Sequence, residues 1–421
     1  MTPEIKQRIE QIRRGEVPEG YVKKRKVVIP QQWGLPQIKD IASISSGSTP
    51  NRNNSEYWNG NIAWVTTGEL SSGHVNHTSE LITVKAVKET RMRIYPQGTL
   101  LMAMYGQGKT RGTVAILEID AAVNQACAAI TVKDGKSKFL FYQLKNSYQD
   151  IRKLSNTGNQ ENLNADIIKT YQVPWAPDEE QERISTILTT QDRVIELKEK
   201  RLAGKQRQKK YLMQQLLTGK KRLPGFSEEW KKVKIGSFIK EIDERSTVNN
   251  QYEILSVTKN GMVFQSSHFN KQIASENNVG YKVVRRGNLA FSTMNLWMGS
   301  LDTLRICDTG IVSPAYKVFE FNQSLIVVNF AENYMKSAEM IWLYKANSEQ
   351  GASIVRRNLD LQALLNSEVA LPDISEQTAI AEVLSAADHE IDLLRQDIEQ
   401  EKQKKKALMQ LLLTGIVRVK T

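Results

Sequence analysis

Apolar residues recur at steps of three and four along two long stretches of the chain. The seam of the second stretch is interrupted only where Glu401 and Lys405 would fall, and otherwise consists of Ile380, Leu384, Ala387, Ile391, Leu394, Ile398, Leu408 and Leu412. The first stretch carries Ile184, Leu188, Gln191, Ile195, Lys198, Leu202, Leu212 and Leu216 at the matching positions. Such a narrow seam predicts two helices that pack on each other, although amphipathic helices on a globular core are the alternative. The polar residues Gln191 and Lys198 are expected to specify register at some cost in stability.

The two stretches are copies of one another. Residues 180–219 and 376–415 align without a gap at an offset of 196, and about 16 of the 40 positions are identical. A helix from Glu180 to Thr218 would be about 58 Å long at ~1.5 Å per residue. Gly219 and Gly415 are well placed to end the two helices as C-terminal caps. The chain is therefore a direct internal repeat.

Short strand-like runs separated by turn residues fill the segments ahead of both helices. They lie at residues 62–66, 99–104, 113–119 and 128–132, and again at 253–257, 288–292 and 315–319. Helices are expected near residues 138–154 and 333–345. The pattern predicts an α+β fold in which a strand-rich domain feeds a long helix, twice. The expected boundaries are a tail (1–30), a first strand-rich domain (31–175), a central long helix (176–222), a second domain (223–371) and a C-terminal long helix with its tail (372–421).

The interiors of the two domains differ, in contrast with their helices. The first contains LLMAMYGQGKTRGTVAI from Leu100, whereas the second contains NLAFSTMNLWMGSL from Asn288. Two similar scaffolds whose loops differ in sequence suggest two recognition domains of different specificity.

The length of the chain indicates how many folded units to expect, and its charge indicates the kind of partner. A chain of 421 residues is expected to form two or more folded units, and its net charge of +12 favours nucleic acid or an acidic membrane surface. No apolar run of about 18 residues and no signal peptide is visible, so we expect a cytoplasmic protein without a membrane partner. Cys127 and Cys307 are expected to be small buried residues, not a disulfide. The lysines near the helix ends fit a solvated face, with phosphate contact as the alternative.

Signs of catalysis are weak. The GQGKTRG segment from Gly106 has the wrong spacing for a phosphate-binding loop, and the chain lacks the NPPY-like or DPPY-like tetrapeptide of amino-methyltransferases. His74 and His77 could bind a metal, but no second ligand pair accompanies them, which favours polar loop residues. We therefore expect no catalytic residues, no metal site and no cofactor.

Several motifs together resemble the specificity subunit of type I restriction-modification systems. They are the helix endings LMQQLLTG and LMQLLLTG, the Glu-Gln dipeptides after VPWAPDE and LPDIS, the SSGSTP turn from Ser45, the loops YGQGKTRG and MNLWMG, and the tail MTPEIKQRIEQIRRGEVPEGY. In that family two target recognition domains are held apart by a pair of antiparallel helices, in a pseudo-twofold arrangement. Each domain reads one half of a split, asymmetric site in double-stranded DNA. Two methyltransferase subunits dock on the helices, and restriction subunits that use ATP and magnesium on their own chain complete the nuclease.

The resemblance implies base-reading residues in the loops of the two domains. Our candidates are Tyr105, Gln107, Lys109 and Arg111 in the first domain, and Asn295, Trp297, Arg356 and Arg357 in the second. Arginine pairs well with guanine, and glutamine or asparagine with adenine, in the major groove. The alternative is that Tyr105 and Trp297 are buried and that Arg111 makes a surface ion pair. A stand-alone DNA-binding regulator or architectural protein remains the rival function.

Overall fold

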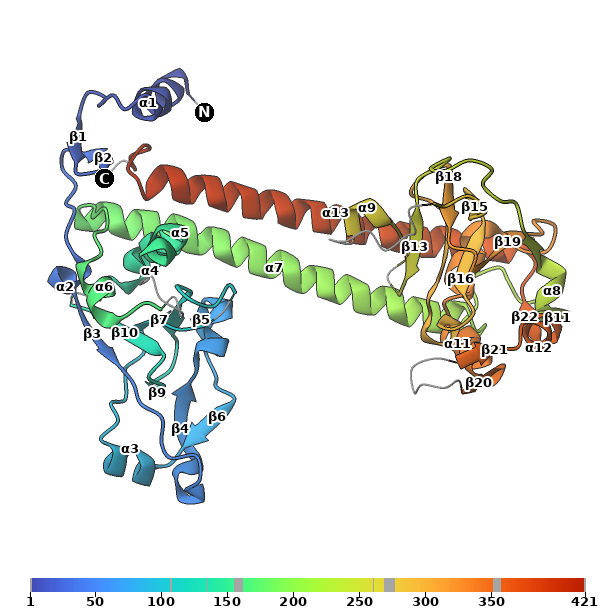
Figure 1. Ribbon diagram of the computed structural model, residues 1–421, viewed down its shortest axis with the longest axis horizontal. Coiled ribbons are helices and arrows are strands. Elements are labelled where there is room, and N and C mark those ends of the chain that lie inside the picture. The colour runs from blue at the N-terminus through green and yellow to red at the C-terminus, as the bar shows by residue number, and fades with distance from the viewer. Residues whose placement is uncertain are drawn as a thin grey trace. The chain divides into compact units, whose positions relative to one another are not determined.

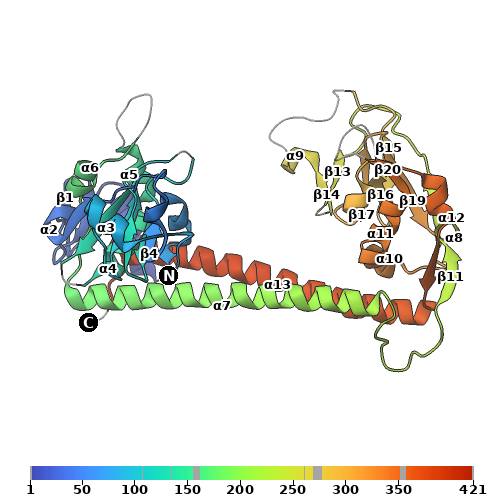
Figure 2. The ribbon, with the colours of Figure 1, turned by 90° about the horizontal axis from the view of Figure 1, so that it is seen from below.

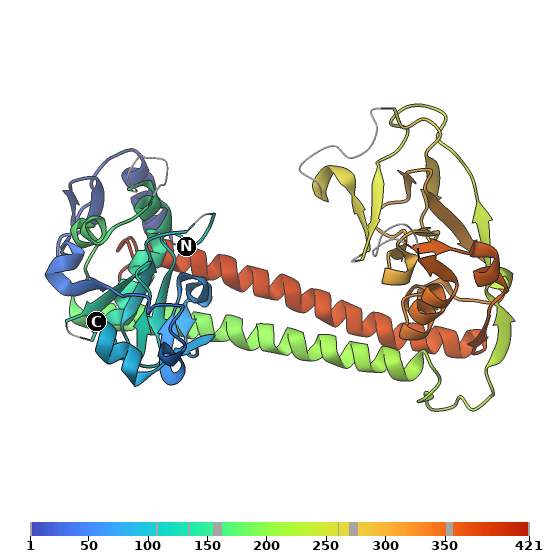
Figure 3. The same ribbon diagram turned by 60° about the horizontal axis from the view of Figure 1, so that its bottom comes forward.

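The computed structural model describes residues 2–106, 108–133, 135–154, 162–259, 261–268, 277–350 and 357–419. The chain forms two compact units. Unit 1 comprises Met1–Lys198 together with Asp397–Thr421, and unit 2 comprises Glu199–Gln396. The start of the chain and the end of the last helix thus belong to the same unit (Figure 3).

Unit 1 is built on a five-stranded sheet with a smaller three-stranded sheet beside it (Figure 1). The five strands, in spatial order, are β3 (Ala42–Ser46), β10 (Cys127–Val132), β7 (Leu100–Ala103), β8 (Val114–Leu117) and β5 (His74–Val75). The smaller sheet has the order β6 (Glu80–Ile82), β4 (Trp58–Val65), β9 (Ala121–Val123), and β1 (Tyr21–Lys24) pairs with β2 (Val27–Pro30). The short helices are α1 (Pro3–Arg13), α2 (Ile38–Ile41), η1 (Ser55–Tyr57), η2 (Thr67–Ser72), α3 (Val84–Thr90), α4 (Ser137–Asn146), α5 (Tyr148–Lys153) and α6 (Ala165–Thr170).

Unit 2 is built on a four-stranded sheet with strand pairs around it. The sheet has the order β12 (Ile239–Ile242), β19 (Tyr316–Phe321), β16 (Leu289–Ser292), β17 (Leu301–Thr303). The pairs are β11 (Lys231–Lys234) with β22 (Glu368–Leu371), β13 (Leu255–Thr258) with β14 (Gly261–Phe264), β15 (Lys282–Arg285) with β18 (Thr309–Val312), and β20 (Ser348–Gln350) with β21 (Arg357–Leu359). The short helices are α8 (Ile235–Phe238), α9 (Gln265–His268), η3 (Leu296–Met298), α10 (Val328–Tyr334), α11 (Ala338–Ala346) and α12 (Leu361–Asn366).

The two sheets share one topology, as a repeat requires. The antiparallel order β3-β10-β7-β8 of unit 1 corresponds to β12-β19-β16-β17 of unit 2. The α+β class is confirmed, and each of the expected strands overlaps an observed one. The single helices expected near residues 138–154 and 333–345 are wrong in detail, because Ser147 separates α4 from α5 and Ser337 caps the start of α11.

Two long helices, α7 (Asp178–Leu216) and α13 (Ile374–Leu412), each of 39 residues, confirm the expected pair. Within each unit a part of α7 lies beside a part of α13 (Figure 2). In unit 1, Gln191 Nε2 donates to Glu401 Oε2 at 2.6 Å and Lys198 Nζ lies 2.8 Å from Asp397 Oδ1, so the segments run antiparallel. In unit 2, Lys209 lies 2.7 Å from Asp388 and Lys205 lies 2.7 Å from Glu390, again in antiparallel order.

The polar seam residues are matched across the helix pair. Glu401, at the interruption of the second seam, accepts from both Gln191 and Lys198 of the first. Lys405 pairs with Asp192, and the repeat-related pair in unit 2 is Lys209 with Asp388. Because a shift by one turn would separate these partners, the charges specify register as expected.

The first turn of each long helix contains a buried glutamate that the rest of its unit surrounds. Glu180, fully buried, accepts from Trp33 Nε1 at 2.8 Å and from Arg418 Nε at 2.7 Å, and we call these three residues the Glu180 cluster. The Glu376 cluster in unit 2 consists of Glu376, Trp230 and Arg222, with distances of 3.1 and 2.6 Å.

Both helices end where the sequence predicts. Gly219 and Gly415 have φ of +66° and +71°, which suits a glycine cap. Both cysteines are unpaired: Cys127 is buried, as expected, and Cys307 is half-buried. None of the helices formed by the described residues is long and apolar enough to cross a membrane.

Candidate nucleic-acid interface

Polar loops gather at one edge of the main sheet in unit 1. β3 ends at this edge, β10 begins there, and β7 turns into β8 there, as the antiparallel register requires. The connecting segments are residues 47–54, 104–113 and 124–126, and they are rich in Ser, Thr, Asn, Gln and Arg. These side chains offer both donors and acceptors, which is the chemistry needed to read base edges.

The β7–β8 loop, residues 104–113, carries the candidates of the first domain. Tyr105 is 40% exposed and Lys109 is exposed, so both can reach a ligand. Arg111 is only 7% exposed, so DNA would reach its side chain only after the loop moved. Gln107 lies outside the described residues. The alternative of a buried Tyr105 is therefore wrong, and so is a surface position for Arg111.

Helix α5 packs against this loop and donates hydrogen bonds to it, a contact that was not predicted from the sequence. Tyr148 Oη donates to the carbonyl of Lys109 at 2.7 Å, and Arg152 Nη1 donates to the carbonyl of Arg111 at 2.8 Å. Gly112, with φ of +82°, packs so closely that a Cβ would lie 3.2 Å from Arg152 Cγ. The only signal for this contact in the sequence was the spacing of Tyr148 and Arg152, which are four residues apart and therefore share one face of a helix.

The candidates of the second domain lie in the matching β16–β17 loop. Asn295 and Trp297, both half-buried, are in or next to η3 within this loop. Arg357 begins β21, and its N–H approaches the carbonyl of Met294 at 3.4 Å, so Arg357 lies beside the same loop. Its Nη2 donates to the Ser348 carbonyl at 2.6 Å. Arg356 lies outside the described residues.

Both candidate loops are thus tied to the segment that precedes the last short helix of their domain. In unit 1, the N–H of Leu163 donates to the carbonyl of Met104 at 2.9 Å, and Arg357 with Met294 is the corresponding contact in unit 2. The structure brings Tyr105, Lys109 and Arg111 together on one loop, and Asn295, Trp297 and Arg357 around the other.

Outside the loops, the cysteine and the histidines of unit 1 are each held by burial or by a neighbouring side chain. Burial raises the pKa of the Cys127 thiol to about 12, which keeps it protonated and unreactive at neutral pH. His74 Nδ1 lies 2.8 Å from Glu118 Oε1, and His77 Nδ1 lies 2.6 Å from Asn76 Oδ1. Across the described part of the chain, no three His, Cys, Asp or Glu side chains converge on a point that could hold a metal ion.

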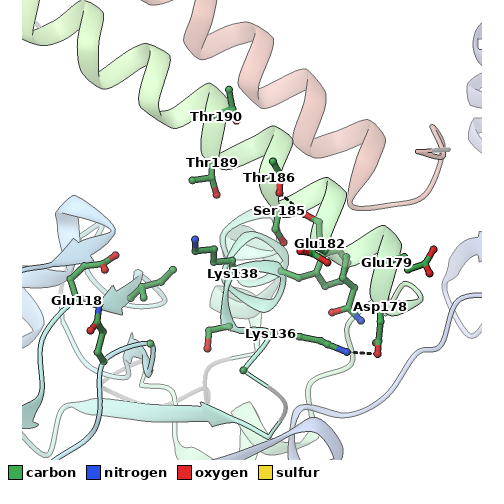
Figure 4. A pocket seen from close by; sticks show the side chains of 17 residues that line it. Glu118, Lys136, Lys138, Asp178, Glu179, Glu182, Ser185, Thr186, Thr189 and Thr190 are labelled. Atoms are coloured by element: carbon green, nitrogen blue, oxygen red, sulfur yellow. Dashed lines mark hydrogen bonds and ion pairs between the residues drawn. The ribbon is translucent and has the colours of Figure 1, made fainter. Parts of the chain in front are cut away.

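A cavity of about 870 Å³ lies in unit 1 between α4 and the first half of α7 (Figure 4). Ser185, Thr186, Thr189 and Thr190 of α7 line it on one side. The charged residues in the lining are Glu118, Lys136, Lys138, Asp178, Glu179 and Glu182, and Lys136 pairs with Asp178. Because its carboxylates outnumber its lysines, this cavity is a poor site for a phosphate backbone.

Comparison with protein families gives one match, repeated along the chain. The family described as "Type I restriction modification DNA specificity domain" matches residues 30–204 and again residues 227–403. The type I restriction enzyme MjaIX specificity subunit of Methanocaldococcus jannaschii is 34% identical over 178 residues, 41% of this chain and 40% of that protein. The putative type I restriction enzyme MjaX specificity subunit of the same organism is 25% identical over 93% of this chain and 95% of its own length.

Solved structures share the fold at low identity. The type I restriction-modification S subunit from M. genitalium superposes with a TM-score of 0.53 at 13% identity, over 93% of this chain and 98% of that one. A chain from a structure of a type I restriction-modification system, solved to explain complex assembly, gives a TM-score of 0.57 at 14% identity, over 92% and 99%. At this identity the likeness establishes the fold alone.

Proposed function

Because this chain belongs to the type I restriction modification DNA specificity family, we propose that it reads a bipartite, asymmetric sequence in double-stranded DNA and directs partner methyltransferase and restriction subunits to it. The observation that carries the proposal is the pairing of one sheet topology, present twice, with unlike loops at the same sheet edge. Domains with the same sheet topology place their loops on DNA in the same way, whereas loops of different sequence recognise different bases.

The two strand-rich segments, residues 31–175 and 223–371, are the target recognition domains in this proposal. Residues 176–222 and 372–421 supply the helices, and residues 1–30 form a tail. The exposed Tyr105 and Lys109 make the first contacts of the β7–β8 loop, whereas Arg111 acts from within it. Gln107 reads from the same loop, and Asn295, Trp297, Arg356 and Arg357 read from the second domain. The net charge of +12 supports binding to the phosphate backbone.

Catalysis resides in the partner subunits, and this chain contributes specificity without a cofactor of its own. Two methyltransferase subunits dock on α7 and α13, and restriction subunits join them. The acidic, hydroxyl-rich cavity along α7 supports a protein partner better than DNA on that face of unit 1. The complex works in the cytoplasm, where its DNA substrate is.

Mapping of methylated bases tests the proposal. The chain is co-expressed with its methyltransferase subunits, and the modified positions in host DNA are sequenced. We expect a single motif with two unlike half-sites separated by a fixed spacer. The chain purified alone should bind this motif more weakly than the assembled complex. Tight binding alone, without any methylated motif in the presence of the methyltransferase subunits, would instead favour a DNA-binding regulator.

A further inference from the structure

The turn between β9 and β10 in unit 1 presents an exposed glutamine at the same sheet edge as the β7–β8 loop. Asn124 Oδ1 accepts from the N–H of Ala126 at 3.2 Å, and the N–H of Cys127 donates to the Asn124 carbonyl at 3.2 Å. These two bonds close a tight turn with Gln125 at its tip, where the side chain is exposed.

Neighbouring elements hold this turn rigidly on both sides. The N–H of Asn124 donates to the Val65 carbonyl of β4 at 3.0 Å. The carbonyl of Ala126 accepts from the N–H of Met104 at 2.8 Å, which joins the turn directly to the start of the β7–β8 loop. Gln125 therefore lies beside the loop that carries Tyr105, on backbone that is fixed before any ligand arrives.

A third loop reaches Gln125 from the end of β3. Ser48 donates its N–H to the Val123 carbonyl at 3.0 Å, and its own carbonyl accepts from Trp64 Nε1 at 3.1 Å. Only glycine fits at position 47, since a Cβ there would lie 1.7 Å from the Val123 oxygen. This close approach places the exposed Thr49 so that its Oγ1 hydrogen-bonds Gln125 Oε1.

The bond from Thr49 orients the carboxamide for base reading. A glutamine oxygen has two lone pairs, and Thr49 uses one of them, which leaves one acceptor site and both N–H donors of Nε2. This donor and acceptor set matches N7 and N6 of adenine in the major groove. We propose that Gln125 reads an adenine in the half-site of the first domain, with Thr49 as its positioning residue. This inference rests on the proposed function.

A purely structural role explains the pair poorly. Both side chains are exposed, and a hydrogen bond between exposed groups adds at most about 1 kcal/mol to stability. The corresponding turn of unit 2, which precedes β19, consists of Ser313, Pro314 and Ala315 and has no glutamine. A residue present in one copy of the sheet and absent from the other fits a role in one half-site only.

The experiment measures methylation by the full chain assembled with its methyltransferase subunits. Substrates carry each single base-pair change in either half-site. In the Gln125→Ala variant, discrimination at one A·T pair of the first half-site should fall by ~5- to 150-fold, the range for one bidentate contact. Thr49→Val should give a smaller loss at the same base pair. Gln31→Ala is the matched control, because Gln31 is an exposed glutamine of unit 1 that directly follows β2 and lies outside the three connecting segments.

A charge-changing variant distinguishes a change in base recognition from a folding defect. Gln125→Glu keeps the side-chain shape but has only acceptors, so preference at that position should move from adenine towards cytosine, whose N4 donates. Equal losses at all base pairs, or unchanged discrimination in both Gln125 variants, would overturn the inference. If the unmodified complex methylates no bipartite motif, the proposed function itself fails, and the two failures are thereby distinguishable.

Discussion

Removal of the Arg418 side chain should open the start of α7 and leave unit 2 unaffected. Arg418 follows α13 near the end of the chain and forms a bidentate pair with Glu180, at 2.7 Å from Nε and 2.9 Å from Nη2. Arg418→Ala leaves the Glu180 carboxylate in place with the hydrogen bond from Trp33 Nε1 but without the two from Arg418. The carboxylate is fully buried, so water does not replace the lost donors without structural change.

The expected loss of stability follows from the burial of the Glu180 carboxylate. Removing one partner of a buried ion pair costs about 3–5 kcal/mol, because the remaining charge is uncompensated. The Arg418 side chain is 35% exposed, so water already screens part of the interaction, and we lower the expected cost to about 2–4 kcal/mol. At ~1.4 kcal/mol per factor of ten, the opening equilibrium of this region should rise by roughly 30- to 700-fold.

Hydrogen exchange measured by mass spectrometry resolves the effect by region, which a single melting temperature of a two-unit chain does not. Peptides that contain Trp33 and the first turns of α7 should exchange faster in Arg418→Ala. Arg222→Ala is the matched control, since Arg222 makes the same pair with Glu376 in unit 2. It should accelerate exchange at the start of α13 and leave the start of α7 unchanged.

A second substitution separates lost charge pairing from lost packing. Adding Glu180→Gln to Arg418→Ala removes the buried charge while Trp33 can still donate to the new amide oxygen, so at least half of the lost protection should return. The reasoning is refuted if the double variant is no better protected than Arg418→Ala. It is also refuted if Arg418→Ala and Arg222→Ala accelerate exchange in the same peptides.

Three further predictions follow from other contacts. Hydrogen bonds from Lys198 and, to a smaller extent, from Gln191 lower the pKa of Glu401 to about 2. This carboxylate therefore stabilises unit 1 above about pH 4.5, and its contribution is lost as the pH falls towards 2. In the Lys198→Leu variant, the free energy of unfolding should depend less on pH over this range. Arg111→Ala and Asn295→Ala should each weaken binding to one half-site only, by roughly 1–3 kcal/mol, in titrations with half-site-substituted duplexes; equal losses on all sequences would assign both residues to phosphate contact or folding. Gly47→Ala should lower the melting temperature through overpacking of about 1–3 kcal/mol or more, whereas Gly68→Ala, whose nearest neighbour would be 3.8 Å away, should have little effect.

The long helices could be predicted from the sequence because their signal is local and repeated. A seam of period three and four specifies which face is buried, and the ungapped repeat at an offset of 196 supports the same interpretation twice. What the seam did not reveal was which residues of the other helix its polar residues contact. Gln191 and Lys198 interrupt one helix and Glu401 interrupts the other, and their match depends on which turns of the two helices face each other.

The candidate site was predicted less completely, for a related reason. Residue types, together with the family resemblance, pointed to the β7–β8 and β16–β17 loops, which the structure places at corresponding edges of the two sheets. The burial of Arg111 could not be foreseen, because it depends on how α5 packs beneath the loop. Gln125 was missed because a three-residue turn without charge or aromatic residues has no distinctive pattern, and its position depends on strand register.

The two glutamate clusters are assembled from differently spaced parts of the chain, and in unit 1 the N-terminal tail contacts the residues that follow α13. In unit 2, Arg222 and Trp230 are close in sequence, so one short linker brings both to Glu376. In unit 1, their counterparts Arg418 and Trp33 are far apart in the sequence, so contacts in space bring both of them to Glu180. Tyr21 Oη in the tail donates to the Gly415 carbonyl at 2.7 Å, and Arg8 donates to the carbonyl of Ile416. These two hydrogen bonds join the segment that precedes Trp33 to the segment that carries Arg418, and so support the geometry of the Glu180 cluster.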